Sequence, residues 1–356
     1  MNTKIIKKCA LVVIALTICI VSLTACNTAK QFFVYGTDLE VKVEGSGGNK
    51  LISAVEGYIS SLEPILSPTV SGSDLNKINA SAENVSVKCQ PVTMEIMRFA
   101  EQIYLASDGA FDPSIYPLVK LWSFDSKGFS FQGMTPPPQA EIEETLAVVG
   151  LNRAFTIDYS ASTITKKAGY SKAMLDFGGV AKGYAVDKSL ELANEKQKLL
   201  VNLGGNIGGT NKDYVIGIRN PRKSDTAYFG SFALHKNECI STSGDYERYY
   251  QYKLSAGESA EKTVIYHHIL NPKTGYPSGI NPASGWQYDD ENNDILVSAS
   301  VITDNGAVGD ALSTAVMVLG KVKGIELLNS IGAKAVLIDK NLQHTVVGDV
   351  GFTLKK

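Results

Sequence analysis

A carboxylate, two adjacent glycines and a lysine follow one another within Asp176–Gly183, between a predicted strand and a predicted helix. Gly178 and Gly179 let the backbone turn tightly and approach a ligand with no Cβ in the way. The free N–H groups that begin the following helix, together with the Lys182 ammonium, would attract an anion such as phosphate. A plain strand–turn–helix junction is equally rich in glycine, so this segment indicates a phosphate site without establishing one.

Asp310 and Thr314 lie four residues apart in a predicted helix, so both side chains project from one face. A carboxylate and a hydroxyl are hard oxygen ligands that suit Mg²⁺, which leaves several positions to water or to phosphate oxygens. Asp310 would then be an exposed carboxylate of the site. The alternative is structural, because an Asp in the first turn of a helix is favoured by the helix dipole and Thr314 would merely pack.

Two of the four histidines, His267 and His268, are neighbours at the end of a predicted strand that runs into an Asn271–Pro272 turn. Neighbours on a strand point to opposite faces, so at most one of them faces a given site. A histidine beside a phosphate can accept or donate a proton near neutral pH. The alternative is a strand histidine that only forms a hydrogen bond with a neighbour.

Two aromatic residues, Trp122 and Phe124, follow a turn-rich stretch that begins at Asp108. Their rings would either stack on a flat ligand or belong to the hydrophobic core. Two more glycine-rich segments, Asn202–Asn206 and Ser241–Asp245, have the composition of turns. None of these segments identifies a function by itself.

The elements that must position these residues are a mixture of helices and short strands. Apolar residues at helical spacing predict helices at residues 51–66, 94–106, 141–149, 181–193, 309–319 and 322–331. Shorter apolar runs predict strands at residues 32–43, 155–157, 199–203, 214–218, 228–234, 238–242, 249–254, 264–270 and 335–338. The predicted fold is α+β, a single large domain of mostly antiparallel strands with flanking helices over residues 33–356.

The N-terminal segment predicts export. Three lysines within the first eight residues precede an apolar stretch that is too short for a transmembrane helix. This stretch ends in Leu-Thr-Ala-Cys at Cys26, similar to the lipobox of bacterial lipoproteins. We therefore expect a signal peptide at residues 1–25, then a lipidated Cys26 and a short tether at residues 26–32. The protein would be lipid-anchored on the extracytoplasmic face of the cell membrane; a simple secreted protein and an uncleaved anchor are the alternatives.

The formal net charge of the chain is −2. Removal of residues 1–25, which carry three lysines and no acidic residue, gives −2 − 3 = −5. This negative charge gives no indication of a nucleic-acid partner. After Cys26 only Cys89 and Cys239 remain, and they would either pair in an oxidising compartment or be buried as small apolar residues. No CxxC motif accompanies them, which argues against a zinc site.

Taken in order, these segments resemble the ApbE family of bacterial flavin transferases. The chain is similar to the family's successive motifs at Asp176–Gly183, Asn202–Asn206, Ile216–Pro221, Ser241–Arg248, His268–Gly275 and Asp310–Ala315. Gly36 with Thr37, and the region 108–124, resemble the family's flavin-binding entry segments. The likeness covers nearly all of the chain after residue 25.

The resemblance implies an FAD:protein FMN transferase. Such enzymes bind FAD with Mg²⁺ at its pyrophosphate; a Thr or Ser hydroxyl of an acceptor protein attacks the FMN-side phosphorus, and AMP leaves. By motif position, Mg²⁺ would be held by Asp310, Thr314 and the backbone carbonyl of Gly179. Asp310 would thereby be catalytic, and His268 would lie nearest the transferred phosphoryl group as a candidate base. The flavin nucleotide would be contacted by Tyr35, Ser123, Phe124, Asp125, Asp176, Lys182 and Ile269.

Two departures and two alternative functions accompany the resemblance. Asn271 stands where the family often has Asp, and Ser123 where a Gly is common; these departures concern the orientation of the flavin and remove no metal ligand. Water in place of the acceptor hydroxyl would make the protein an FAD pyrophosphatase that releases FMN and AMP. Without catalysis it would be a surface lipoprotein that carries FAD. The expected acceptor is a membrane-associated electron-transfer flavoprotein, because a tethered enzyme meets tethered partners most often.

Overall fold

The computed structural model describes residues 27–125, 134–223, 227–254, 262–283, 286–287 and 294–355. The predicted signal peptide at residues 1–25 and the predicted lipidation site, Cys26, lie outside these residues. Within them, no helix is both long enough and apolar enough to cross a membrane.

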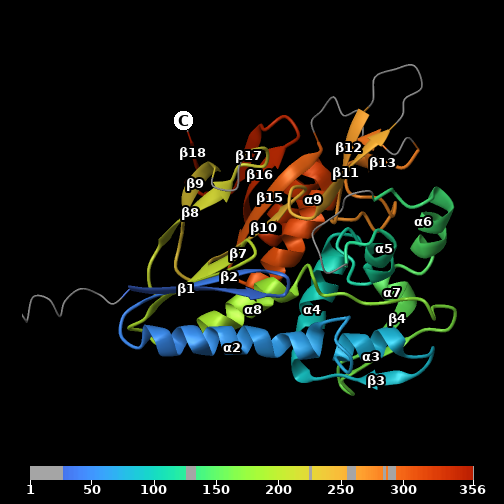
Figure 1. Ribbon diagram of the computed structural model, residues 1–356, viewed down its shortest axis with the longest axis horizontal. Helices are drawn as coiled ribbons and strands as arrows, with labels where there is room; N and C mark the ends of the chain where they lie inside the picture. The colour runs from blue at the N-terminus through green and yellow to red at the C-terminus, as the bar shows by residue number, and fades with distance from the viewer. Residues whose placement is uncertain are drawn as a thin grey trace, which may run out of the picture.

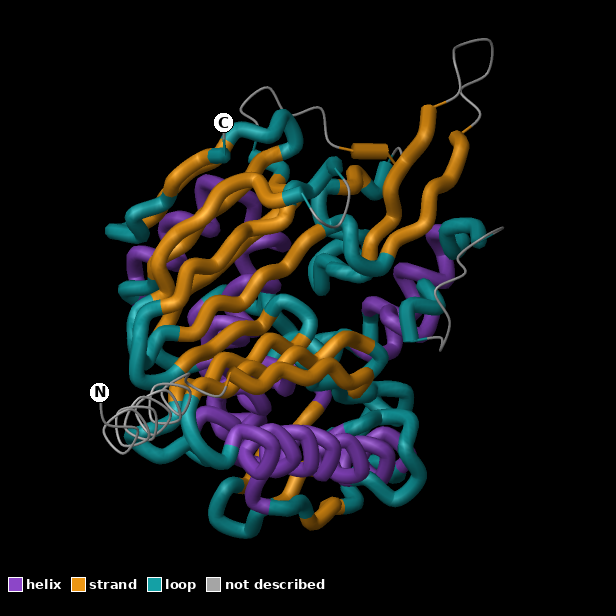
Figure 2. The backbone as a smooth tube through the Cα atoms, turned by 60° about the vertical axis from the view of Figure 1, so that its left-hand side comes forward, coloured by secondary structure: helices purple, strands orange, loops and turns teal. Residues whose placement is uncertain are grey.

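An eight-stranded sheet forms the centre of the fold (Figures 1 and 2). Its strands lie in the order β1-β2-β6-β7-β10-β15-β16-β17, and every neighbouring pair is antiparallel. The predicted α+β class with mostly antiparallel strands is confirmed. The strands are β1 (Asn27–Val34), β2 (Thr37–Glu44), β6 (Lys198–Leu203), β7 (Asn206–Gly209), β10 (Cys239–Gly244), β15 (Leu296–Thr303), β16 (Lys334–Asp339) and β17 (His344–Val347).

Three helices cover one face of this sheet: α2 (Gly48–Leu66), α8 (Ala181–Leu190) and α9 (Gly306–Ile331) (Figure 1). α9 packs on β10 and β15, α8 packs on α9, β6 and β7, and α2 packs on α8 and on β1 and β2. The helices predicted at residues 309–319 and 322–331 are the two halves of α9, which is interrupted at Gly320 (φ 78°, ψ −177°). In α2 the buried apolar residues recur at helical spacing, at Leu51, Ile52, Val55, Ile59, Leu62 and Leu66.

A smaller sheet of β8 (Tyr214–Arg219), β9 (Tyr228–Leu234) and β18 (Thr353–Leu354) packs on the opposite face of the large sheet. Side chains of the large sheet alternate between the two cores. In β16, Leu337 packs with the helices, whereas Ile338 packs with the smaller sheet. The central strands of the large sheet are therefore buried on both faces.

A cluster of aromatic side chains supports the remaining part of the fold. β11 (Tyr249–Leu254) and β12 (Lys262–His267) form a hairpin that projects from the body of the molecule (Figure 2). Tyr250 and Tyr266 of this hairpin pack on Phe124 and Trp122, which follow α5 (Tyr116–Leu121). The other described elements are α3 (Asp74–Ala80), β3 (Ser86–Lys88), α4 (Pro91–Ala106), α6 (Gln139–Leu146), α7 (Leu151–Ala154), β4 (Phe155–Asp158), β5 (Thr163–Lys166), β13 (Ile280–Asn281) and β14 (Trp286–Gln287).

The expectations for the first strand and the tether are wrong. Residues 27–31, expected as a tether, belong to β1, and residues 32–43, expected as one strand, form the β1–β2 hairpin. The turn residues Tyr35 and Gly36 have φ angles of 54° and 70°, as a two-residue type I′ turn requires. The described domain therefore begins at Asn27 rather than at residue 33. The strand predicted at residues 264–270 ends earlier, at His267.

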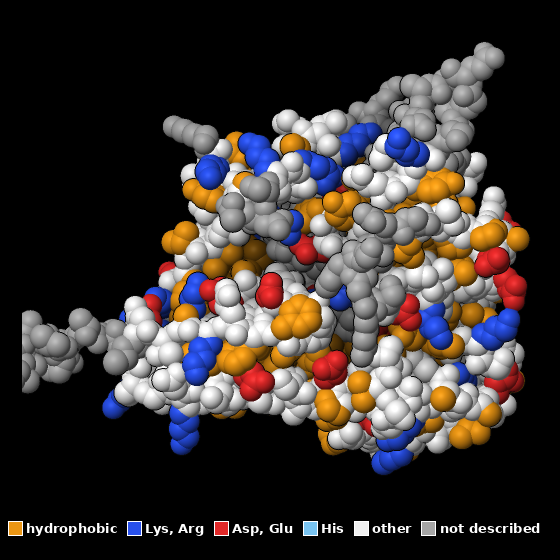
Figure 3. All heavy atoms as spheres, in the orientation of Figure 1, with side chains coloured by type: hydrophobic (Ala, Val, Ile, Leu, Met, Phe, Trp, Pro, Cys, Tyr) orange, Lys and Arg blue, Asp and Glu red, His pale blue; other side chains and the backbone are white. Residues whose placement is uncertain are grey.

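The structure places the two cysteines and the charged side chains in the fold. Cys89 and Cys239 are free thiols and both are buried, which is the alternative in which they serve as small apolar residues. Acidic and basic side chains are interspersed over the described part of the face shown in Figure 3.

Candidate active site

The candidate site forms where α8 crosses α9, and two glycines set the closeness of this crossing. A Cβ on Gly183 would stand 2.0 Å from the carbonyl oxygen of Gly306, and a Cβ on Gly306 would stand 2.5 Å from that of Gly183. Because no side chain separates the helices here, the Gly183 N–H donates to Oδ2 of Asp310 at 3.0 Å. Asp310 is held at the crossing with 4% of its surface exposed, so the expectation of an exposed carboxylate is wrong.

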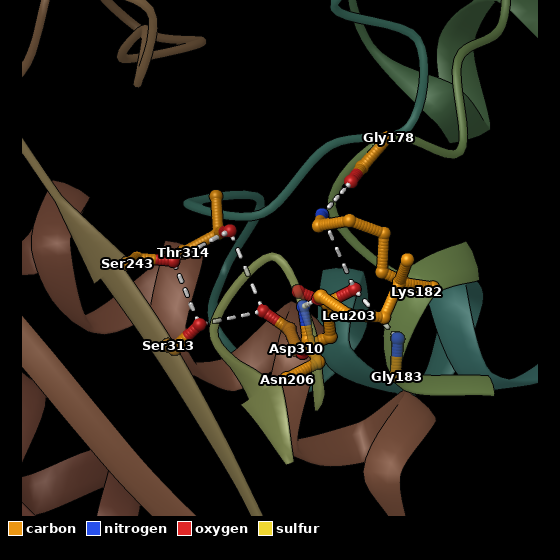
Figure 4. Close-up of polar contacts among 9 residues, drawn as sticks. All are labelled: Gly178, Lys182, Gly183, Leu203, Asn206, Ser243, Asp310, Ser313 and Thr314. Carbon is orange, nitrogen blue, oxygen red and sulfur yellow. Dashed lines mark hydrogen bonds and ion pairs between the residues drawn. The ribbon is translucent and has the colours of Figure 1, made fainter. Parts of the chain in front are cut away.

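The turn that precedes α8 approaches α9 one helical turn beyond Asp310. A Cβ on Gly179 would stand 3.3 Å from Oγ1 of Thr314 and 3.1 Å from Cε2 of Phe111. The Thr314 Oγ1 atom lies 3.4 Å from the Asp310 carbonyl oxygen and 3.4 Å from Oγ of Ser243 (Figure 4). The structure therefore brings Gly179, Asp310 and Thr314 together from two separate segments of the chain.

Lys182 lies over this crossing. Its Nζ donates to the carbonyl oxygen of Gly178 at 2.6 Å and lies 3.7 Å from Oδ2 of Asp310 (Figure 4). Asp176, before the same turn, is half-buried. Burial raises the pKa of its carboxyl above the ordinary value, opposed by the Gly178 N–H and by the charges of Lys182 and Arg248. Two cations therefore act on one small region, which favours an anionic ligand.

His268 is the first residue after β12. Its N–H donates to the carbonyl oxygen of Arg248 at 2.9 Å. Its Nδ1 atom is buried and has no hydrogen-bond partner in the described part of the chain. Burial lowers the pKa of His268 to about 3, with further lowering by His267, Arg248 and Lys182. A neutral imidazole with an unused ring nitrogen therefore lies within electrostatic reach of Lys182.

Arg248 connects this histidine to the β1–β2 turn. Its Nη2 atom lies 3.3 Å from the position of a Cβ on Gly36, so the guanidinium packs on the turn. The neighbouring Tyr35 donates its hydroxyl to the carbonyl oxygen of Ile59 in α2. The polar end of Tyr35 is thus used within the fold, and only its half-buried ring remains for a ligand.

Known proteins match nearly the whole described chain. A family model described as the ApbE family matches residues 35–337. The chain belongs to the ApbE family. It is 29% identical over 294 residues to the FAD:protein FMN transferase of Klebsiella pneumoniae, which covers 82% of this chain and 83% of that protein. The solved ApbE protein of Thermotoga maritima has a TM-score of 0.75 at 27% identity and covers 90% of this chain and 96% of that one. The flavinyl transferase ApbE of Pseudomonas stutzeri gives 0.69 at 26% identity, with 91% and 96% covered.

The residues that the ApbE resemblance assigns to the flavin differ in their surroundings. Ser123 has a φ of 58°, the left-handed conformation for which the glycine common at this position in the family is better suited. Asp125 is half-buried and accepts a hydrogen bond from the Tyr116 hydroxyl at 3.4 Å. Phe124 is 2% exposed among aromatic rings and Ile269 is 4% exposed. In this structure Phe124 therefore takes the core alternative, and its contact with the flavin stays a prediction.

Three residues of the site received no role from the sequence: Ser243, Ser313 and Arg248. Oγ of Ser243 lies 2.7 Å from Oγ of Ser313, which ties β10 to α9 beside Thr314. Ser243 and Arg248 lie inside the ApbE-family motif at Ser241–Arg248, so their positions in that motif were an available signal. Which of its side chains face the crossing depends on tertiary structure.

The oxygen atoms at the crossing fit a magnesium ion. The Asp310 carboxylate, the Thr314 hydroxyl and the Gly179 carbonyl are hard ligands, and the absent Cβ of Gly179 leaves room beside Thr314. Residues within the described ranges include no group of three or more His, Cys, Asp or Glu side chains that could hold a metal. A site with one carboxylate would complete its shell with water or phosphate oxygens, as Mg²⁺ commonly does.

Proposed function

We propose that this protein transfers the FMN part of FAD to a Thr or Ser hydroxyl of a partner protein and releases AMP. The observation that carries the proposal is the meeting of Gly179, Asp310 and Thr314 beside Lys182, since oxygen donors next to a fixed cation suit a metal-bound pyrophosphate. The names of its relatives support the same reaction. Phosphoryl transfer depends mainly on positioning and charge neutralisation, and this site supplies both.

We assign the binding of Mg²⁺ to Asp310, Thr314 and the backbone carbonyl of Gly179. The ion would neutralise charge on the pyrophosphate and on the leaving AMP. Lys182 would hold a phosphate oxygen, because its ammonium has donors beyond the one bonded to Gly178. The N–H groups that begin α8 would add to this anion site.

His268 would receive the proton of the acceptor. The acceptor oxygen forms a bond to the FMN-side phosphorus while the bond from that phosphorus to the AMP oxygen breaks, and AMP leaves with the electron pair. The hydroxyl proton moves to His268, whose Nδ1 has no partner in the part of the chain that the structure describes. Its low pKa keeps the ring neutral but makes it a weak base in the free protein. A bound pyrophosphate, being anionic, would raise that pKa and so strengthen the base.

Intact-protein mass spectrometry tests the reaction. The protein is mixed with FAD, Mg²⁺ and an acceptor domain that carries the family's Thr/Ser motif. A metal-dependent gain of one FMN on the acceptor, together with AMP, supports the proposal, and Asp310→Asn serves as the inactive control. AMP and free FMN without a gain would identify an FAD pyrophosphatase, and bound intact FAD would identify a carrier. Either of these results would reject the transferase.

We also propose that the protein acts on the extracytoplasmic face of the cell membrane, anchored by lipid on Cys26 after removal of residues 1–25. The support is the sequence, with its lysines, apolar stretch and Leu-Thr-Ala-Cys ending. The acceptor would then be a membrane-associated electron-transfer flavoprotein. Cys26→Ser should move the protein from the membrane fraction to the soluble fraction; retention in the membrane would favour an uncleaved anchor.

A further inference from the structure

The loop from His268 to Ser278 carries the proposed base, and one buried side chain, that of His267, holds both of its ends. Nε2 of His267 lies 3.1 Å from the carbonyl oxygen of Ser278, and Nδ1 accepts the N–H of Ile269 at 3.3 Å. A backbone N–H can only donate, so Nδ1 carries no proton. Nε2 therefore carries the proton and donates it to Ser278. Both ring nitrogens are used, and the residue is 4% exposed.

Backbone hydrogen bonds also hold this loop: the His268 N–H donates to the carbonyl oxygen of Arg248 at 2.9 Å, and the Asn271 N–H donates to that of Tyr276 at 2.8 Å. The Ser278 N–H donates to the carbonyl oxygen of Ile269 at 2.9 Å, and Nε1 of Trp122 donates to the carbonyl oxygen of Gly275 at 2.8 Å. Among the described strands β12 pairs only with β11, so no second strand flanks it. The side-chain hydrogen bonds of His267 connect β12 to this loop, in place of the backbone hydrogen bonds that a further strand would form.

The charges next to His267 come from a paired arginine and aspartate. Arg222 donates to both carboxylate oxygens of Asp245, each at 2.7 Å. Asp245 raises the pKa of His267 and Arg222 lowers it, while burial, the largest effect, also lowers it. The ring is therefore neutral, in agreement with the hydrogen-bond roles of its two nitrogens.

We propose that His267 is a positioning residue for the transfer reaction, because its imidazole fixes the loop so that the neighbouring His268 faces the phosphoryl site. The proposal rests on the function proposed above. The bond from the Ile269 N–H to Nδ1 of His267 spans the backbone of His268, so the His267 ring fixes the chain on both sides of His268. A shift of a reacting group by about 1 Å reduces the rate by about 100-fold, so the loss of this fastening should be seen in kcat.

Three substitutions separate the two hydrogen bonds of His267. His267→Asn keeps an acceptor near the Nδ1 position, for Ile269, and His267→Gln keeps a donor near the Nε2 position, for Ser278. His267→Leu loses both. We expect kcat to fall by about 100-fold for the Leu variant and by less for the other two. His235→Gln is the matched control, since His235 is exposed and paired with Asp213; its kcat should equal that of the parent.

NMR of the histidine rings in the free protein reports the position of His268 separately from any loss of stability. The chain has four histidines, so the ring signals of histidine-labelled protein are few. In the Asn and Gln variants of His267 we expect shifted His268 signals and faster amide exchange at Ile269, with His235 and His344 unchanged. Parental His268 signals and kcat, or a lower Tm as the sole effect, would overturn the proposal. If the parent protein transfers no FMN, the proposed function fails, but the His268 signals still decide whether His267 positions it.

Discussion

Replacing Gly183 with alanine tests how closely α8 and α9 must approach for the site to form. The new Cβ would stand 2.0 Å from the Gly306 carbonyl oxygen and 2.8 Å from Cβ of Asp310, whereas ordinary contacts begin at 3.4 Å. The helices would have to separate by 3.4 − 2.0 = 1.4 Å at this point. Asp310 lies on the helix that moves, so it would leave its position opposite Gly179.

The same change should affect activity more than stability. Overpacking costs about 1–3 kcal/mol, and the better helix propensity of alanine returns up to about 1 kcal/mol. We therefore expect Gly183→Ala to lower the free energy of unfolding by about 1–2 kcal/mol. The displacement of Asp310 by about 1 Å should reduce the rate of FMN transfer by about 100-fold.

Gly57→Ala is the matched control, because Gly57 lies on the exposed side of α2 and a Cβ there would meet nothing within 4 Å. It should raise the free energy of unfolding by about 0.5–1 kcal/mol and leave activity unchanged. Both variants would be compared by urea unfolding and by the rate of transfer as a function of Mg²⁺ concentration. A Gly183→Ala protein as stable and as active as Gly57→Ala would refute the close crossing as the basis of the site.

Three further changes test the charges of the site. Asp310→Asn keeps an acceptor for the Gly183 N–H, so we expect a free energy of unfolding close to that of the parent protein. The transfer rate, measured as the mass gain of the acceptor, should fall by at least about 100-fold. A normal rate would show that Asp310 does not bind the metal. The second change is in pH. Below pH 6.5 the unfolded chain protonates His268, while the folded chain, with its pKa near 3, does not, so stability falls as the pH falls. At about pH 5 this costs at most about 2 kcal/mol relative to neutral pH, and His268→Gln should remove that part of the loss in urea unfolding; an equal loss in the variant would contradict the burial of the ring. Lys182→Met should weaken FAD binding by about 10–100-fold, measured by flavin fluorescence, and raise the pKa of His268; unchanged affinity would exclude a phosphate contact.

Several elements could be predicted from apolar patterns that are local in the sequence. α2 shows its core residues at helical spacing, and β9 and β11 have the bounds that their apolar runs predict. The sequence also predicts the two halves of α9 as helices at residues 309–319 and 322–331, and the structure interrupts α9 between them at Gly320. In each case the signal is local.

Several strands were not predicted from the sequence, and β15 and most of β1 show why tertiary pairing is needed to determine them. β15 is buried at every residue from Leu296 to Ile302, and no regular alternation of apolar and polar side chains runs along the whole strand. β1 is mostly polar and lies at the edge of the sheet, so its pairing with β2 makes it a strand. The local pattern of apolar and polar residues therefore does not reveal either strand.

The site shows the same division. The glycine turn and the spacing of Asp310 and Thr314 indicated a metal and phosphate site, and the structure brings these segments together. The need for glycine at residue 183 follows from the crossing with Gly306, which lies far along the chain. The two hydrogen bonds of His267 likewise depend on where the chain returns at Ser278.

The strand that replaces the expected tether has a consequence for how the enzyme would meet its partners. A flexible segment of residues 26–32 could have carried the domain up to roughly 20 Å from an anchor. β1 instead begins at Asn27 and pairs along its whole length, from Asn27 opposite Glu44 to Val34 opposite Thr37. With lipid on Cys26, the edge of the sheet would stay at the bilayer surface. The active site would then reach acceptor groups only within a narrow range of heights above the membrane. The height at which a partner presents its hydroxyl above the membrane would then select substrates as strictly as the sequence around that hydroxyl.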